Sequence, residues 1–519
     1  MLKAAIALAA VLLLAARLRR EADQQPPSRL QEMGLAGLGL IAFLAWFNFG
    51  AYGFGTYVHH YEFFHYYLGS KYSSELGYTG LYACVGAAEI EEGRRKEVHG
   101  RWMRDLRNNE IREGISFGAD FTECRSRFTS ATRWNEFKHD VEYFRTHLDP
   151  EVWRTAVIDH GYNPSPVWTV AGKALASTGP ASNVQIALLS WIDPLLLVGI
   201  GAAVWSTFGW RVLSIALIWW GTNHLSRYYF LGGAFLRHDW LLLAVLALCF
   251  AKRGRMILSG TALTWAALIR VFPAIIAIGL LLKILIDSMQ AKRLCLTATH
   301  ARFGAGALVA LAVWLPLSLT VRGPDERPLG AWHEFITNTR RMAGTSSVNQ
   351  VGLPTVLAFE PSHRSARVMN FWVDTPWDVW RAGRSQTLHE RRAFQILLVA
   401  AFMVLLAFSV AGRDDWIALT LGVAAIPILV ELSNYYYGVL LALAFLWPLR
   451  PIAGIGLAAT AVLSNVVLGL WAFEDDRYTV ISIVVLLLVT SIAVAFARRA
   501  PLKKTAVTSP TGLGSIATV

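Results

Sequence analysis

The stretch from Tyr478 to Ala497 reads YTVISIVVLLLVTSIAVAFA and contains no charged residue. About 20 predominantly apolar residues are enough for an α-helix to cross the hydrocarbon core of a bilayer. Backbone N–H and C=O groups find no partner in lipid, so a segment of this composition must be helical there. Arg498 and Arg499 follow directly, which makes one end of the stretch basic. The stretch therefore predicts a membrane-spanning helix.

The rest of the chain repeats this pattern. Hydrophobic residues make up 55% of the chain and charged residues 16%, against about a quarter charged in a typical soluble protein. The weak alternating pattern of an outer-membrane barrel is absent. We therefore predict an all-α polytopic membrane protein with about 12 to 13 transmembrane helices. The apolar stretches fall at 35–54, 186–207, 210–226, 238–251, 256–270, 274–287, 303–321, 394–411, 416–432, 435–449, 452–471 and 478–497.

Basic residues give the chain a formal net charge of +12 and lie in short clusters between these stretches. The predicted spans put every cluster on one side of the membrane, which the positive-inside rule makes cytoplasmic. The membrane topology accounts for the positive net charge, so we predict no nucleic-acid partner. The clusters are Arg17, Arg19 and Arg20; Lys252, Arg253 and Arg255; Lys292 and Arg293; and Arg498, Arg499, Lys503 and Lys504.

This topology predicts a multi-pass protein of a bacterial inner membrane whose active face is extracytoplasmic. Residues 2–16 are apolar, but the arginines after them resist translocation and no A-x-A cleavage site precedes them. We interpret them as a retained short helix or anchor, and whether they span the membrane stays open. The predicted regions are 1–54 (short helix and first main span), 55–185 (long outer loop), 186–321 (transmembrane helices), 322–393 (second outer loop), 394–497 (transmembrane helices) and 498–519 (cytoplasmic tail).

The long outer loop is strongly polar from about 88 to 160, with apolar residues at helical spacing. We expect amphipathic helices packed on the membrane face. Cys84 and Cys124 both fall in this loop, where either a disulfide or two free thiols fit the sequence. Cys249 and Cys295 lie in or near a helix and the cytoplasmic side, where thiols stay reduced.

The most informative outer stretch runs from His59 to Tyr72 and reads HHYEFFHYYLGSKY. Glu62 lies just beyond the first long span among aromatic residues, and partial desolvation would raise its pKa toward that of a useful general base. His65, Tyr66 and Tyr67 offer ring faces for stacking on a sugar. The alternative is an aromatic belt at the membrane interface with a solvated Glu62.

Arg270 interrupts two apolar runs near the outer face. An arginine at this depth normally pairs with an anion or a carboxylate, and the guanidinium fork suits a lipid phosphate. A structural salt bridge or a snorkelling side chain is the alternative. A short outer turn with the sequence Arg237-His238-Asp239 precedes another apolar helix and is a second candidate stretch.

A third set of polar residues lies in the second outer loop and at a later helix end: Arg340, Asn349, Gln350 and Tyr435. A plain helix-end location is the alternative for all of them. His333-Glu334 begins an H-E-x-x-H pattern, but position 337 is threonine, so a zinc-protease site is excluded. No phosphate-binding loop or dinucleotide fingerprint occurs. A sugar donor would therefore come from within the membrane.

Four places in the chain resemble glycosyltransferase family 87, whose members are GT-C enzymes that use polyprenyl-phosphate mannose or related donors. They span about residues 50–440, and each motif is short. The first outer loop resembles the family's D-F-x-x-Y-Y…L-Y pattern, with glutamate at the position where the family usually has aspartate. The stretch from Ala266 to Pro273 resembles the family's K-x-x-P step, with arginine at the position where the family usually has lysine. The matching residues are Glu62-Phe63, Tyr66-Tyr67 and Gly80-Leu81-Tyr82; Leu258-Ser259-Gly260; Arg270 and Pro273; and Asn349-Gln350 with Leu353.

The resemblance implies an inverting transfer of a sugar, mannose first, from a polyprenyl-phosphate donor to a glycolipid or glycan acceptor. Glu62 would be the catalytic base, and Arg270, with His238 and Arg340, would bind the donor phosphate. No cofactor is implied; a divalent metal stays open, without a carboxylate cluster that requires one. Two other classes fit the sequence: a transporter or flippase of a lipid-linked or small solute, and a non-catalytic scaffold in envelope assembly.

Overall fold

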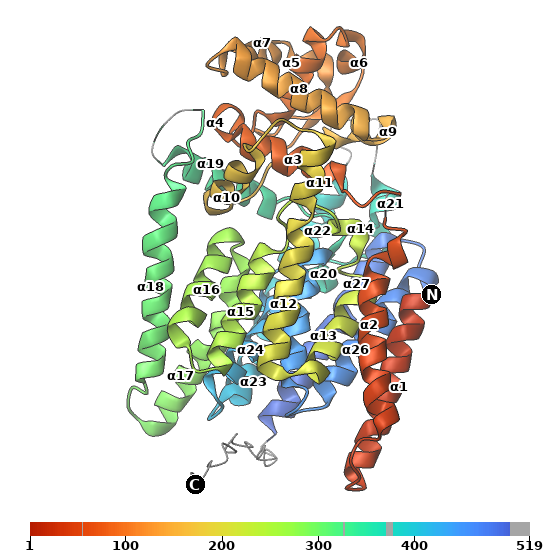
Figure 1. Cartoon of the computed structure of the whole chain (residues 1–519), viewed down its shortest axis with the longest axis vertical. Coiled ribbons are helices and arrows are strands. Elements are labelled where there is room, and N and C mark those ends of the chain that lie inside the picture. The colour runs from red at the N-terminus through yellow and green to blue at the C-terminus, as the bar shows by residue number, and fades with distance from the viewer. Residues whose placement is uncertain (54, 325–326, 328, 370–376, 499–519) are drawn as a thin grey trace, which may run out of the picture.

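The computed structural model describes residues 1–498 except 54, 325–326, 328 and 370–376, and it is 74% helical. Upright helices form a bundle with a smaller helical domain above it (Figure 1). Within these described residues, six helices are long and apolar enough to cross a membrane, which indicates a multi-pass membrane protein. They are α11–α12 (Asn183–Phe208), η3–α17 (Phe272–Ala291), α18 (Ala298–Ser318), α23 (Arg392–Val410), α26 (Ile452–Leu470) and α27 (Glu474–Ala497).

Shorter apolar helices stand among these six. They reach close packing through small residues, as membrane helices commonly do. At Gly260 and Gly306, where α16 crosses α18, an added Cβ would collide with the backbone of the other helix. The shorter helices are α13 (Trp210–Thr222), α15 (Asp239–Lys252), α16 (Met256–Ile269), α24 (Asp415–Gly422), α25 (Ile426–Leu429) and the 3-10 helix η6 (Asn434–Leu446).

The N-terminal helices differ from the predicted boundaries. α1 (Leu2–Ala22) is longer than the predicted anchor and packs against α26 and α2. α2 (Arg29–Trp46) begins earlier than predicted, at a capping box formed by Ser28 and Gln31. It also ends earlier than residue 54, because Asn48 and Phe49 adopt positive φ angles that no continuous helix allows.

The basic clusters share one end of the bundle. In Figure 1 the C-terminal end of α1 and the α17–α18 connection lie at the same end as the last turn of α27. Arg499, Lys503 and Lys504 lie outside the described residues. This arrangement agrees with the prediction that the basic clusters lie on one side of the membrane, the side that the positive-inside rule makes cytoplasmic.

The first outer loop forms a domain of packed helices above the bundle, and its buried residues are continuous with the core of the bundle. The apolar faces of these helices pack within the protein, so the expectation of amphipathic helices packed on the membrane face was wrong in this respect. Phe63, Phe64, Phe137 and Phe144 are fully buried in it. A disulfide joins Cys84 to Cys124. Its elements are α3 (His60–Lys71), α4 (Ser73–Leu76), α5 (Leu81–Glu91), α6 (Arg95–His99), α7 (Gly118–Ser126), α8 (Ala131–His147), α9 (Pro150–Ala156), α10 (Pro166–Ala176) and the antiparallel strands β1 (Trp102–Arg104) and β2 (Ile111–Glu113).

The second outer loop contacts this domain. The Glu334 carboxylate accepts a hydrogen bond from the Tyr78 backbone N–H at 3.0 Å, and Arg341 donates to the Leu106 carbonyl at 2.5 Å. These hydrogen bonds join the two outer segments above the bundle. The elements are α19 (Gly330–Ala343), β3 (Gln350–Val351), α20 (Leu353–Leu357), α21 (Ser365–Val368) and α22 (Asp378–Glu390), with β3 antiparallel to β4 (Leu432–Ser433).

Candidate functional site

Helix α3 carries Glu62 in its first turn, where a negative charge is favoured by the helix dipole. The His59 side chain caps the helix by accepting the Glu62 backbone N–H. Residues four apart lie on one helix face, so Glu62 and Tyr66 share a face. The opposite side of the helix carries Phe64 and Tyr67 into the core of the outer domain.

Glu62 forms an ion pair with Arg237, whose Nε lies 3.2 Å from Glu62 Oε2. Arg237 lies in the turn before α15, and its backbone N–H donates to Asp193 Oδ1 on α12 at 2.9 Å. Leu236, the residue before it, has a φ of +53°. This fixed turn directs the arginine toward α3 and away from lipid.

Arg270 approaches the same place from another helix. α16 ends at Ile269, and Arg270 takes an extended conformation that carries its side chain out of the helix line. The residue is 8% exposed. The guanidinium carbons of Arg237 and Arg270 lie 4.1 Å and 5.8 Å from the ring centroid of Tyr66. Two cations thus meet at one aromatic ring.

Several N–H groups of these arginines lack a hydrogen-bond partner in the described part of the chain. They are Nη1 of Arg237 and Nε and Nη2 of Arg270, all buried. A buried donor without a partner costs about 1 to 3 kcal/mol, and more when it is charged. Native proteins keep such groups rarely, and a missing ligand is one explanation for them. The arrangement is suited to receive an anion with several acceptor oxygens.

The electrostatics of Glu62 suit a general base. Burial raises its pKa above the ordinary value, and Asp159 raises it further, while Arg237, His65 and Arg270 lower it. Glu62 keeps 17% of its side chain exposed, whereas Arg237 keeps 2%. A carboxylate with a raised pKa that still touches solvent can take a proton from a hydroxyl group that reaches it.

Tyr435 completes one wall of the site. Its ring centroid lies 5.6 Å from the Arg237 guanidinium. Asn434, the residue before it, is fully buried and accepts a hydrogen bond from the Asn349 side chain at 3.2 Å. Asn349 therefore positions the chain that carries Tyr435. Gln350 caps a local turn by accepting the Ser347 N–H, and it has this structural role.

Four predicted residues lie elsewhere. Tyr67 is turned to the opposite face of α3 and donates to the Gly179 carbonyl. His65 is held between the Tyr61 carbonyl and the Tyr82 hydroxyl. His238 pairs with Asp193 at 3.1 Å between aromatic rings, and Arg340 is exposed on α19. The structure therefore brings together Glu62, Tyr66, Arg270 and Tyr435, and it places His238 and Arg340 away from them.

Two residues of the site, Arg237 and Asp239, lie in a stretch that the sequence singled out, but the sequence reasoning assigned a role only to His238 between them. Arg237 stands next to the predicted His238, and the same signal that singled out Arg270, a cation in an apolar setting, applies to it. Asp239 begins α15, and its charge acts on Arg270. Which of three adjacent polar residues faces the site depends on the turn conformation, which no pattern in the sequence encodes.

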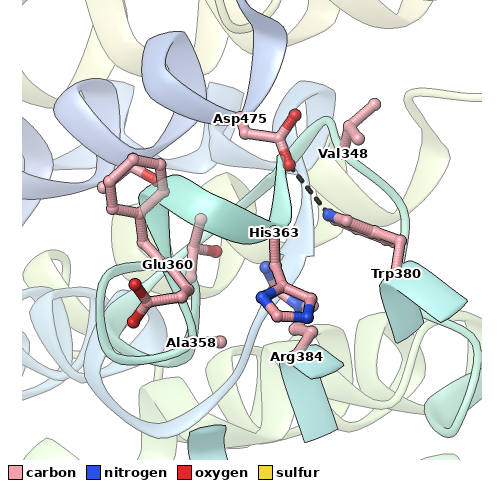
Figure 2. Close-up of a pocket in the computed structure, with 10 residues that line it drawn as sticks. Val348, Ala358, Glu360, His363, Trp380, Arg384 and Asp475 are labelled. Carbon is pink, nitrogen blue, oxygen red and sulfur yellow. Dashed lines mark hydrogen bonds between the residues drawn. The ribbon is translucent and has the colours of Figure 1, made fainter. Parts of the chain in front are cut away.

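A separate small cavity lies between the second outer loop and the start of α27 (Figure 2). Its volume is about 20 Å³, room for one water molecule. Asp475 accepts a hydrogen bond from Trp380 at 2.9 Å, and Arg384 pairs with Glu431. Arg384 and Asp475 thus both have partners, and these contacts join the second outer loop to the bundle.

Within the described residues, no group of three or more His, Cys, Asp or Glu side chains is arranged to hold a metal ion. Comparison with known proteins found no matching family model, curated protein or solved structure. The resemblance to glycosyltransferase family 87 therefore stays a prediction.

Proposed function

We propose that this chain is an inverting, GT-C-type glycosyltransferase that moves a sugar from a polyprenyl-phosphate donor to an envelope acceptor. The proposal rests on one observation above the others. Two buried arginines, Arg237 and Arg270, present N–H donors that have no partner among the described residues, at the Tyr66 ring beside the partly exposed Glu62. Such a transfer requires cations that neutralise the donor phosphate and a base close to the acceptor hydroxyl.

The reaction begins at the acceptor hydroxyl. Glu62 removes its proton while the oxygen attacks the anomeric carbon of the donor sugar from the face opposite the phosphate. The new C–O bond forms as the bond between the anomeric carbon and the phosphate oxygen breaks, which inverts the configuration. The electron pair leaves on the polyprenyl phosphate, where Arg270 and Arg237 neutralise the developing charge. Tyr66 and Tyr435 provide aromatic faces for the sugar ring.

The location of the site supports a lipid donor. Arg270 follows the outer end of an apolar helix, and Glu62 lies in the first turn of a helix of the outer domain. A polyprenyl chain in the bilayer with its phosphate at the interface would bring the sugar between them. We further propose a bacterial inner membrane, mannose as the sugar, and a glycolipid or glycan as the acceptor. No cofactor is part of this mechanism.

The test uses membranes that contain the full chain and radiolabelled undecaprenyl-phosphate mannose. We expect transfer of label to envelope glycolipid or glycan, and loss of that transfer in Glu62→Gln. Glu151→Gln, which alters an exposed acid of the outer domain, is the matched control. Undiminished transfer by Glu62→Gln would remove Glu62 as the base. Movement of labelled lipid across the membrane without a covalent product would instead favour transport.

A further inference from the structure

A second group of basic side chains lies at the outer ends of α1, α14 (Tyr228–Leu231) and α27. Lys3 is in the first turn of α1, Arg227 precedes α14, and Arg477 is in the first turn of α27. The ring centroid of His224 lies 5.9 Å from that of Phe230 on α14 and 6.3 Å from that of Tyr478 on α27, and α1 packs against α26, which ends just before α27 begins. The charges of Lys3, Arg227 and Arg477 all act on the buried His224. Four basic residues from distant parts of the sequence thus share one neighbourhood.

We propose that Lys3, Arg227 and Arg477 form a binding site for the phosphate of an anionic lipid in the outer leaflet. The site shares no residue with the Glu62 site and does not depend on the proposed glycosyl transfer. Clusters of lysine and arginine at the membrane surface are the usual recognition element for anionic lipid head groups.

Among the described residues, no carboxylate pairs with Arg227. Its guanidinium carbon lies 5.2 Å from the Tyr229 ring centroid and 5.1 Å from that of Phe230. Cation–π contacts orient a cation but leave its charge uncompensated. Its Nε is buried and has no hydrogen-bond partner in the part of the chain that the structure describes. A guanidinium fixed in this way is preorganised to receive a phosphate oxygen.

The acids at the start of α27 are mostly engaged elsewhere. Asp475 accepts hydrogen bonds from Ser365 and Trp380, and Asp476 accepts from Arg364 at 3.0 Å. Glu474 is exposed. The second outer loop therefore takes up two of the three negative charges of this helix turn. An excess of positive charge remains around Arg227.

The surroundings favour a lipid over a dissolved anion. Exposed apolar and aromatic side chains flank the basic group: Leu2 is 60% exposed, Leu470 is 69% exposed and Tyr229 is 49% exposed. Tyrosine at the level of the head groups is typical of membrane proteins, and exposed leucines beside it can contact acyl chains. A phosphate held at Arg227 would thus keep its acyl chains against α1 and α26.

The experiment places the full chain in nanodiscs of phosphatidylcholine with a fraction of phosphatidylglycerol and counts retained lipids by native mass spectrometry. We expect the wild type to retain phosphatidylglycerol over phosphatidylcholine. Each cation removed by Lys3→Gln or Arg227→Gln should weaken retention about fivefold, because one such charge near an anionic lipid surface contributes about 1 kcal/mol. Arg227→Lys should retain most of the binding. Arg154→Gln, an exposed outer-domain arginine, is the matched control.

Three results would overturn the proposal: unchanged retention in the Lys3→Gln and Arg227→Gln double variant, equal retention of the two lipids by the wild type, or full displacement of the lipid by inorganic phosphate alone. The last would mean that the site takes a free anion. If the double variant does not fold, as judged by thermal unfolding, Lys3→Gln and Arg477→Gln are measured singly. The same fivefold loss is expected for each, and unchanged retention in both would equally overturn the proposal.

Discussion

Glu62 and Arg237 form an ion pair of unequal exposure: the carboxylate keeps 17% of its side chain accessible, and the guanidinium 2%. The arginine is therefore enclosed by protein, while the carboxylate faces the space that a substrate would enter. Because Arg237 Nη1 has no hydrogen-bond partner in the part of the chain that the structure describes, one guanidinium can hold Glu62 and a phosphate oxygen together. Donor binding would then be coupled to the protonation state of the base.

The pH dependence of transfer should change when Arg237 is replaced. Burial raises the pKa of Glu62, and Arg237 is the strongest of the charges that lower it. A base must be deprotonated, so the rate should rise with pH up to the pKa of Glu62. In Arg237→Gln that rising limb should move to higher pH, and in Arg237→Lys it should move less. A limb that stays in place or moves to lower pH would contradict the coupling.

Arg270 should act mainly on the lipid donor. Arg270→Ala removes buried N–H donors from the proposed phosphate, and hydrogen bonds to charged groups contribute about 1.5 to 3 kcal/mol each. We therefore expect KM for the polyprenyl-phosphate sugar to rise about 10- to 100-fold. Arg270→Lys keeps the charge but loses the planar fork, so its KM should be intermediate. Arg322→Ala, an exposed arginine of the outer side, is the control. An unchanged donor KM in Arg270→Ala would remove the phosphate contact.

Hydropathy predicted the general plan of the molecule because the bilayer imposes strict rules on composition and length. The regular spacing of Trp134, Phe137, Val141 and Phe144 likewise predicts the apolar face of α8. What that face packs against is not encoded in the spacing. The structure places it against other helices of a domain, where the sequence suggested a membrane surface.

The site was only partly predictable for a related reason. Glu62 and Arg270 stand out in sequence, since charges beside apolar runs are costly and therefore informative. The rotation of α3, which separates Tyr66 from Tyr67, and the turn that selects Arg237 over His238 depend on tertiary contacts. Those contacts include the hydrogen bonds of Asp193 to the backbone of the turn, from a helix about 40 residues away.

The disulfide should be a main support of the outer domain. Cys84 and Cys124 are 40 residues apart, and a closed loop of that length is worth about 4 kcal/mol in the chain-entropy description. Cys84→Ser should therefore lower the resistance of the outer domain to limited proteolysis, while the transmembrane fragments stay protected. Cys295→Ser, a free cysteine outside this domain, is the control. Equal digestion of Cys84→Ser and wild type, with and without reductant, would argue against this role.

The buried pair of Lys71 and Asp140 should be the most sensitive ion pair of the outer domain. Nζ of Lys71 lies 2.7 Å from Asp140 Oδ2, and the aspartate, which is fully buried, also accepts from the Tyr72 hydroxyl and the Ala181 N–H. In Asp140→Asn the lysine stays buried without its counter-charge, which costs about 3 to 5 kcal/mol. Thermal unfolding of the purified chain, monitored by tryptophan fluorescence, should therefore occur at a clearly lower temperature. Glu136→Gln, an exposed acid of the same helix, should change stability by less than about 0.5 kcal/mol. Similar unfolding temperatures for the two variants would show that the pair contributes no more than a surface contact.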